Sequence, residues 1–181
     1  MGYWKYENQK KKNFREKNKP NRKRAAAKKT PAIYRNKKVK EKIKKAQKFP
    51  LSASDILYLL KTEPNFLGVY GSDELQYLKI LRYPSFVVVN LDKISDIGRH
   101  WVGLRFGSNS IELFDSLGGD PNIWKFYPHY FISFLTNYSF SHTFYCTPIL
   151  QPSDSILCGL YCVLFVRFRQ KYNCTQIVNM F

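Results

Sequence analysis

Several features that would indicate a membrane protein, a secreted protein or a metalloprotein are missing from this sequence. Its 181 residues contain no uninterrupted apolar run of about 18 residues, the length that a membrane-spanning helix needs. The N-terminus is charged and has no apolar stretch of the kind found in secretory signals. Only three histidines are present, and no two cysteines follow a C-x-x-C spacing. We therefore expect no membrane contact, no secretory signal and no metal site.

Acidic residues are scarce in the first 50 positions. That segment holds 20 Lys and Arg against 3 Asp and Glu, whereas residues 51–181 hold 10 basic and 10 acidic side chains, so the net charge of +17 belongs to the segment. Such a block of like charge buries too little apolar surface to fold alone. We predict a largely disordered basic arm over residues 1–50, with a short helix over 36–49 where Val39, Ile43 and Ala46 form an apolar stripe. Residues 51–181 form the folded domain.

The composition of the arm is typical of segments that contact nucleic acid, because Lys and Arg neutralise phosphates and release counterions. Residues 19–24, KPNRKR, also resemble a nuclear-localisation cluster. A solubilising tail is the alternative. Aromatic side chains are few here, so base stacking is not the expected mode of binding. The residues that we expect to contact phosphates are Lys10, Lys11, Lys12, Arg22, Lys23, Arg24, Lys28 and Lys29.

Helical and strand patterns follow one another along the neutral body. Ser52 or Ser54 is suited to cap a helix that ends before Pro64. Apolar runs predict strands over 84–90, 100–106, 110–115 and 144–150, while residues 65–70 are expected to lead into a loop. Helices are expected over 158–172 and over 122–138, where Trp124, Tyr127, Phe131, Phe134 and Leu135 fall near one face. This order predicts an α+β fold in which helices flank an antiparallel sheet.

Three side chains of the kinds that nucleophilic catalysis combines, a histidine, an acid and a cysteine, lie at the ends of these elements. His100 opens a strand, Asp115 ends the neighbouring strand, and Cys158 begins a helix. A helix N-terminus and a nearby imidazolium both favour the thiolate form of cysteine. The imidazole takes the thiol proton and later protonates a leaving amine, while a carboxylate fixes its tautomer. Gln151 is placed to donate to an oxyanion together with the backbone N–H of Cys158, and Gly159 lets a substrate backbone come close.

Each of these residues also has an ordinary structural alternative. A cysteine before an apolar helix is more often a core residue, a histidine at a strand start is more often a satisfied surface or core residue, and Asp115 is a common turn residue. Cys162, one turn after Cys158, is expected to be a small buried hydrophobe. Cys146, Cys158, Cys162 and Cys174 are interpreted as free thiols of a reducing compartment, with zinc binding as the alternative.

Together, these residues point to a known family. His100-Trp101, the segment from Leu113 to Gly118, Gln151 and Cys158-Gly159 resemble the adenovirus-type maturation cysteine proteases (adenain family) and the related SUMO and ubiquitin-like-protein proteases. Residues 66–70, FLGVY, and the Val-Asn ending of the strand over 84–90 favour the adenovirus branch. So does the seven-residue step from Gln151 to Cys158, which is usually six in SUMO proteases. Asp115, where the adenoviral enzyme has Glu, favours the other branch.

The resemblance carries further implications. It implies a circularly rearranged papain-like fold over roughly residues 52–181, with His100, Asp115 and Cys158 as the catalytic triad and Gln151 in the oxyanion hole. Trp101 and Gly159 would line a substrate cleft that favours small residues, often Gly, before the scissile bond; packing under the sheet is the alternative role of Trp101. No cofactor is needed for the chemistry, but DNA and a short viral peptide act as activators in the family. Cys146 lies in the region of the cysteine that links this peptide, and an ordinary strand residue is its alternative role.

Three functions follow from these observations. The first is a cysteine endopeptidase of a DNA virus or virus-like element that cleaves structural precursor proteins during virion maturation, held on nucleic acid by its arm. We expect this enzyme to be a monomer in the host nucleus and the virion. The second is a protease or isopeptidase of ubiquitin-like proteins with a nuclear-localising arm. The third is a catalytically inactive, basic nucleic-acid-binding protein.

Overall fold

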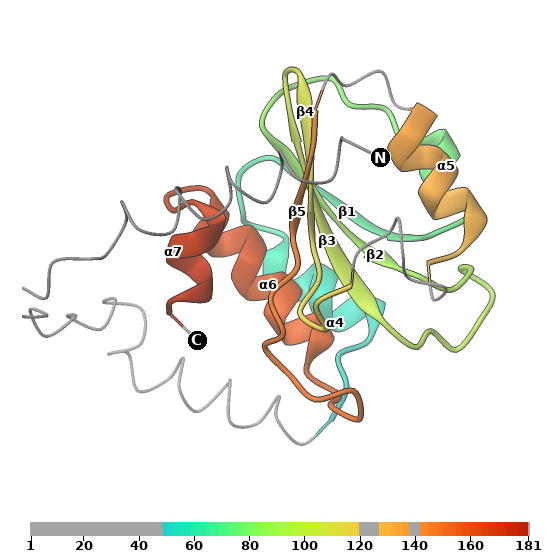
Figure 1. Cartoon of the computed structure of the whole chain (residues 1–181). Coiled ribbons are helices and arrows are strands. Elements are labelled where there is room, and N and C mark those ends of the chain that lie inside the picture. Colours follow the sequence, from blue (N-terminus) through green and yellow to red (C-terminus); the bar gives the residue numbers. More distant parts are fainter. Residues whose placement is uncertain (1–48, 120–126, 138–141, 181) are drawn as a thin grey trace, which may run out of the picture. The chain divides into compact units, whose positions relative to one another are not determined.

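A computed structural model of the chain describes residues 49–119, 127–137 and 142–180 (Figure 1). Residues 1–48 of the predicted arm, with the residues expected to contact phosphates and nearly all of the helix over 36–49, lie outside this range, as does Trp124. The elements in chain order are α4 (Ala53–Leu60), β1 (Phe66–Gly71), the short 3₁₀ helix η1 (Leu75–Tyr77), β2 (Ser85–Asn90), β3 (Trp101–Gly107), β4 (Ser110–Phe114), α5 (His129–Asn137), β5 (His142–Cys146), α6 (Cys158–Arg169) and α7 (Cys174–Val178).

Five strands form one sheet in the order β1-β2-β3-β4-β5. The pairs β2–β3 and β3–β4 are antiparallel, whereas β1–β2 and β4–β5 are parallel. The predicted α+β class is therefore confirmed, but the sheet is mixed and not wholly antiparallel. Parallel neighbours need a crossover connection. The segments that carry η1 and α5 supply these crossovers.

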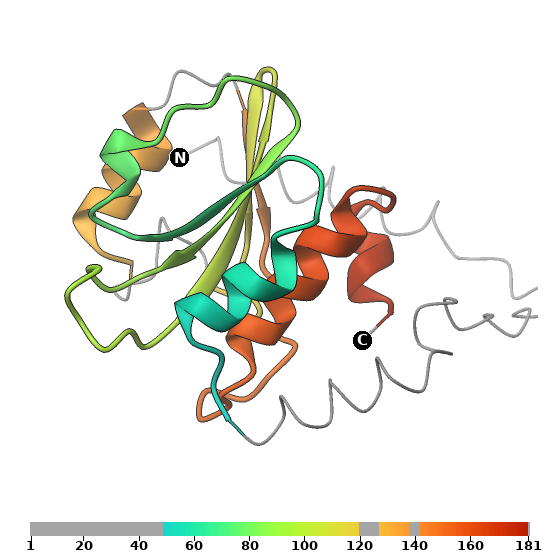
Figure 2. The same cartoon turned by 180° about the vertical axis from the view of Figure 1, so that it is seen from behind.

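Helices cover both faces of the sheet (Figures 1 and 2). On the face of α4 and α6, the Phe165 ring stacks on Phe114 with 4.6 Å between centroids and meets the edge of Phe86 at 6.4 Å. Gly103 allows this approach, because a Cβ at that position would lie 2.8 Å from the Phe165 ring. A close-packed core of this kind fixes the position of α6 against β3, and with it the position of Cys158.

The opposite face is covered by η1 and α5. Phe131 and Leu135 of α5 and Leu75 of η1 are buried against Leu104 and its neighbours in the sheet. Of the face predicted for this helix, Phe131, Phe134 and Leu135 lie on α5 and pack against the sheet, whereas Tyr127 precedes the helix, which begins at His129.

Several predicted boundaries agree with the structure. Ser52 caps α4, accepting the backbone N–H of Asp55, whose carboxylate in turn accepts the N–H of Ser52. The helix predicted from Cys158 begins at that residue, but it ends at Arg169 and not at residue 172. The strand predicted over 144–150 is β5 (His142–Cys146) in the structure. It begins two residues earlier than predicted and ends at Cys146, where the chain leaves the strand. Three elements, β1, η1 and α7, were not predicted.

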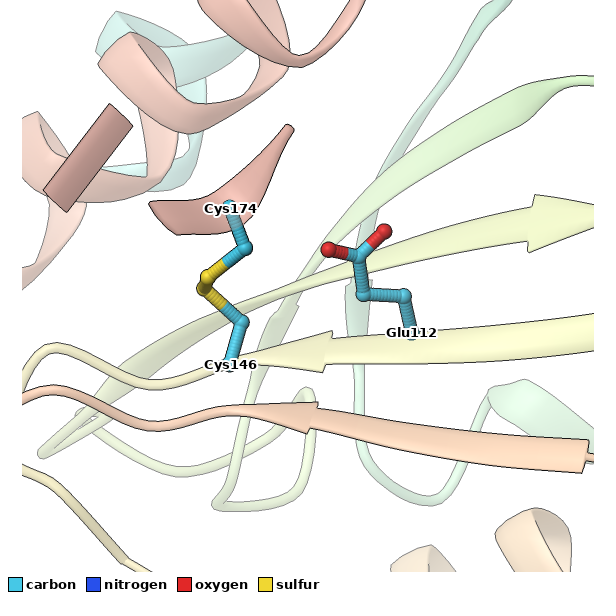
Figure 3. Close-up of side chains that lie close together, drawn as sticks. All are labelled: Glu112, Cys146 and Cys174. Atoms are coloured by element: carbon cyan, nitrogen blue, oxygen red, sulfur yellow. A yellow bond between two sulfur atoms is a disulfide. The ribbon is translucent and has the colours of Figure 1, made fainter. Parts of the chain in front are cut away.

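Cys146 and Cys174 form a disulfide that joins β5 to the start of α7 (Figure 3). Their Cα atoms are 6.1 Å apart, within the range that a disulfide spans. The expectation that all four cysteines are free thiols is therefore wrong for this pair, while Cys158 and Cys162 are free. The sequence could not indicate the pairing, because it depends on how α7 packs.

The same region brings one carboxylate close to the two sulfurs. Glu112, Cys146 and Cys174 have their polar atoms within 4.8 Å of one another (Figure 3). The sulfurs are bonded to each other, and the Glu112 carboxylate accepts a hydrogen bond of 2.9 Å from Arg169 Nε. This arrangement favours a cross-link beside an ion pair over a metal site. None of the helices in the described part of the chain is both long and apolar enough to cross a membrane.

Candidate active site

His100 lies immediately before β3. Its backbone carbonyl accepts the N–H of Leu91 at 3.0 Å, which fixes the chain as it enters the strand. The imidazole is largely buried, with 11% of the side chain exposed, and its Nε2 lies 2.8 Å from Oδ1 of Asp115. The structure therefore brings together the histidine and the acid that the sequence analysis paired.

Asp115 follows the last residue of β4 and is fully buried. Antiparallel pairing of Gly103 with Phe114 places this strand end beside the start of β3. The Asp115 carboxylate accepts hydrogen bonds from the His100 imidazole, the Leu117 N–H at 2.8 Å and the Tyr127 hydroxyl. These three donors hold the carboxylate in one orientation, so it in turn orients the imidazole.

Cys158 is the first residue of α6 and is 7% exposed. Its thiol lies within hydrogen-bonding reach of the His100 imidazole and of the backbone N–H groups of Trp101 and Gly159. Because Nε2 of His100 faces Asp115, Nδ1 is the nitrogen left for the thiol. The histidine thus hydrogen-bonds the carboxylate through one ring nitrogen and acts on the pKa of the thiol, which is the set of three residues that the sequence analysis named.

These contacts change the proton affinities of both groups. Burial alone would raise the pKa of Cys158, but the hydrogen bond to His100, the N–H groups of Trp101 and Gly159 and the imidazolium charge outweigh it and lower the pKa below the ordinary 9.0. Burial alone would lower the pKa of His100, but its hydrogen bonds to Asp115 and Cys158 and their negative charges raise it from 6.5 to about 9. The two shifts favour a thiolate–imidazolium pair.

The second free cysteine has the opposite environment. Cys162 is fully buried in the core between α6 and the sheet, and burial raises the pKa of its thiol well above 9.0. It packs as a small apolar side chain, as the sequence analysis expected.

Gln151 lies beside the acid and is 4% exposed. Its Nε2 donates to Oγ of Ser116 at 2.9 Å, while its Oε1 is buried without a hydrogen-bond partner among the described residues. The residue before it, Leu150, accepts the Tyr161 hydroxyl at 3.0 Å, which joins this segment to the first turn of α6. The glutamine predicted for the oxyanion hole is therefore linked to the residue that follows Asp115.

A cavity of about 400 Å³ is lined by Cys158 and Trp101, together with Val69, Ile94 and Ile97. Trp101 is fixed by its indole N–H, which donates to the carbonyl of Leu51 at 3.0 Å. Trp101 lines this cavity and also packs against the hydrophobic core below α6.

Gly159 serves a different purpose from the one expected. It is buried, and a Cβ there would lie 3.1 Å from Leu51 and 3.2 Å from both Ile56 and Trp101. The glycine lets the start of α6 pack closely against α4 and the indole, so it faces the interior and not a substrate.

Three residues of this site were not identified from the sequence as part of it. Ser116 and Tyr127 hold Gln151 and Asp115, and Leu51 holds Trp101. Tyr127 was recognised only as part of a helix face, and the position of Ser116 directly after the acid was the one available signal for it. The contacts of Tyr127 and Leu51 join segments 12 and 50 residues apart, which no local pattern indicates.

Comparisons with known proteins bear on the family and the fold of the chain. The chain is 24% identical over 121 residues to a protease of Frog adenovirus 1, a match that covers 62% of this chain and 59% of that protein. The crystal structure of an ASFV protease superposes with a TM-score of 0.51 at 19% identity, covering 72% of this chain and 61% of the other. This likeness confirms the predicted cysteine-protease fold. Both matches span less than two thirds of the relative's own length.

The sequence model of the adenovirus endoprotease family matches residues 66–180, from β1 to the end of the described chain. This range contains His100, Asp115, Gln151 and Cys158 and makes up more than half of the chain. The chain therefore belongs to the adenovirus endoprotease family.

Proposed function

We propose that this protein is a cysteine endopeptidase in which Cys158 is the nucleophile, His100 the acid–base and Asp115 the residue that orients it. One observation carries the proposal: the imidazole that hydrogen-bonds a buried carboxylate at 2.8 Å also lowers the pKa of a thiol at a helix N-terminus, and this cysteine lines a cavity. Family membership supports it. The presence of His100, Asp115, Gln151 and Cys158 together also argues against an inactive binding module, in which such a set would be expected to lose members.

The mechanism follows from the contacts. The Cys158 thiolate attacks the scissile carbonyl carbon, forming a C–S bond while the carbonyl π electrons move to oxygen. The backbone N–H of Cys158 and the Gln151 amide donate to this oxyanion. The intermediate collapses, the C–N bond breaks, and the His100 imidazolium gives its proton to the leaving amine. A water molecule, deprotonated by His100, then attacks the thioester, releasing the carboxylate product and regenerating the thiolate.

The proposed substrates are structural precursor proteins of a virus, cut during virion maturation, with small residues such as Gly before the scissile bond. Trp101 on one wall of the cavity supports this, because a bulky indole beside the nucleophile leaves little room for substrate side chains. Asp115 with the following Ser-Leu-Gly sequence favours a second candidate, processing of ubiquitin-like proteins that end in Gly-Gly.

The arm is proposed to hold the enzyme on nucleic acid in the virion and the host nucleus. Pro50 and Leu51, where the arm joins the domain, line the same cavity as Cys158. Nucleic acid bound to the arm would be tethered to the domain, which raises the local concentration of substrates on the same nucleic acid.

The activity is tested with a panel of fluorogenic peptides that carry Gly-Gly or Gly-Xaa before an aminocoumarin, and with a ubiquitin-like protein bearing a C-terminal Gly-Gly electrophile. Cleavage by the wild type, with loss of at least about a thousandfold in Cys158→Ala, is expected. Activity that survives Cys158→Ala would rule out both protease proposals. Rapid labelling by the ubiquitin-like probe together with poor peptide cleavage would favour the second candidate.

A further inference from the structure

Ser116 occupies a fixed and fully buried position in the turn after β4. Its carbonyl accepts the Leu150 N–H at 2.9 Å, and the preceding Asp115 donates its N–H to the Cys146 carbonyl at 3.1 Å. A further bridge pairs Leu117 with Ile149. These backbone contacts join the turn to the segment that leads into Gln151 in one register, so the side chains of Ser116 and Gln151 meet in a defined geometry.

The contact between these two side chains leaves one buried atom unsatisfied. Gln151 Nε2 lies 2.9 Å from Ser116 Oγ, and Gln151 Oε1 has no hydrogen-bond partner among the described residues. Buried amides normally satisfy both ends. A half-turn about the last side-chain bond exchanges the two atoms and places Oε1 on the serine hydroxyl, which can donate as well as accept.

The two amide orientations have different consequences for an oxyanion. With Nε2 on Ser116, one of its two hydrogens is occupied, and the unpaired Oε1 is a partial negative charge beside a developing negative charge. With Oε1 on Ser116, the oxygen accepts the hydroxyl proton, and Nε2 takes the buried position that has no partner among the described residues, so both of its hydrogens are left for an oxyanion. Preorganised N–H donors are what an oxyanion hole requires.

We propose that Ser116 is a positioning residue for the oxyanion hole: its hydroxyl donates to Gln151 Oε1 and so directs the amide N–H groups to the oxyanion. The inference rests on the proposed protease function and deepens it. Since Ser116 directly follows Asp115, a single turn orients both the imidazole, through the carboxylate, and the oxyanion donor, through the hydroxyl.

The test compares wild type and Ser116→Ala on a Gly-Gly aminocoumarin peptide that the wild type cleaves. We expect kcat to fall about 10- to 100-fold with KM nearly unchanged, because the donor is needed only once the oxyanion forms. The affinity for the matching peptide aldehyde, whose adduct with Cys158 carries the same oxygen, should fall by a similar factor. Alkylation of Cys158 by iodoacetamide, which forms no oxyanion, should keep its rate and pH dependence.

Two controls separate positioning from a purely structural role. Ser85→Ala removes another fully buried serine hydroxyl, which donates to the Arg82 carbonyl away from the site, and should leave kcat unchanged. In a Gln151→Ala background, Ser116→Ala should cost nothing more, since the group that it positions is gone. Ser116→Cys, which keeps the volume and a weak donor, serves as the second variant if the alanine form unfolds.

The outcomes distinguish this inference from the function on which it rests. If the wild type cleaves in a Cys158-dependent way but Ser116→Ala retains kcat and aldehyde affinity, the positioning role is wrong and the protease proposal stands. An equal loss for Ser116→Ala with and without Gln151 also overturns the positioning role. If the wild type shows no Cys158-dependent cleavage, both proposals fall.

Discussion

At the residue scale, the candidate site is a chain of proton-sharing contacts. Tyr127 and the Leu117 N–H hold the Asp115 carboxylate, Asp115 holds Nε2 of His100, and His100 faces the Cys158 thiol. Each link fixes the orientation of the next. The raised pKa of the imidazole and the lowered pKa of the thiol result from this chain, because burial alone would shift both in the opposite direction.

Asp115→Asn tests the link between acid and imidazole. The pKa of His100 is about 9 in the folded protein, so the imidazolium persists below that pH and is lost as pH rises through it. Without the carboxylate charge, this pKa should fall, and the alkaline limb of the kcat/KM profile should move to lower pH. We also expect kcat to drop by at least about a hundredfold, because an amide N–H facing Nε2 favours the wrong tautomer. An unchanged alkaline limb in the variant would show that Asp115 does not set the His100 charge.

At the element scale, the N-terminus of α6 is held against the sheet and α4 by tight packing. Phe165 anchors the helix on Phe114, and Gly159 lets its first turn reach Leu51 and Trp101. The position of the nucleophile relative to the cavity wall therefore depends on one residue without a side chain.

Gly159→Ala should disturb the site through this packing. The added Cβ would lie 3.1–3.2 Å from Leu51, Ile56 and Trp101, so overpacking should cost about 1–3 kcal/mol of unfolding free energy. Because the displaced groups flank the sulfur, kcat should fall well beyond what the unfolded fraction explains. Urea unfolding and steady-state kinetics measure the two effects. Cys162→Ala on the same helix is the control, and it should lower stability with little change in kcat.

The disulfide between β5 and α7 should contribute to stability. Cys146 and Cys174 are 28 residues apart in sequence, and closing a loop of that size is worth about 2–4 kcal/mol. Cys174→Ala should lower the unfolding free energy by that amount, and dithiothreitol should lower the wild type to the same value without affecting the variant. Titration of the unreduced, denatured wild type should give two free thiols. Four free thiols would contradict the cross-link.

The elements that carry the site could be predicted from sequence, whereas the contacts that tune it could not. The valine-rich run of β2, the hairpin of β3 and β4 and the apolar helix from Cys158 each have a strong local pattern. In contrast, β1 contains Gly68, a residue type that is disfavoured in strands, so its sequence has only a weak strand pattern. In the structure, Gly68 has a φ of 143°, and the pairing of β1 with β2 is irregular there. The contacts of Tyr127 with Asp115 and of Ser116 with Gln151, and the disulfide, depend on tertiary packing, which no local sequence pattern indicates.

At the scale of the whole molecule, the net charge and the candidate active site lie in different parts of the chain. Residues 1–50 carry the net charge of +17, while the domain that holds the site is neutral. The domain belongs to the adenovirus endoprotease family, but its acid is Asp115, where the adenovirus-type sequence pattern has Glu. Either carboxylate orients an imidazole, so the difference bears on the branch of the family and on substrates more than on the chemistry.

Removal of residues 1–49 tests the role proposed for the arm. With DNA present, full-length protein should cleave a DNA-bound basic substrate faster than without DNA, and the gain should shrink as salt rises because counterion release drives binding. The truncated protein should lose this gain but keep its rate on a small neutral peptide. An equal DNA response in both proteins would show that the arm is not the nucleic-acid-binding segment.

The most direct test of the central claim, that Cys158 is a thiolate paired with His100, is its alkylation rate as a function of pH. Iodoacetamide labelling, quantified by mass spectrometry of the Cys158 peptide, should rise with a midpoint below the ordinary thiol pKa of 9.0 in the wild type. In His100→Ala, the hydrogen bond and the positive charge of the imidazole are missing. The rise in the thiol pKa that burial causes is then opposed less, so the midpoint should move upward. A midpoint that is the same in both proteins, at or above that of an ordinary thiol, would contradict the pairing and the protease function built on it.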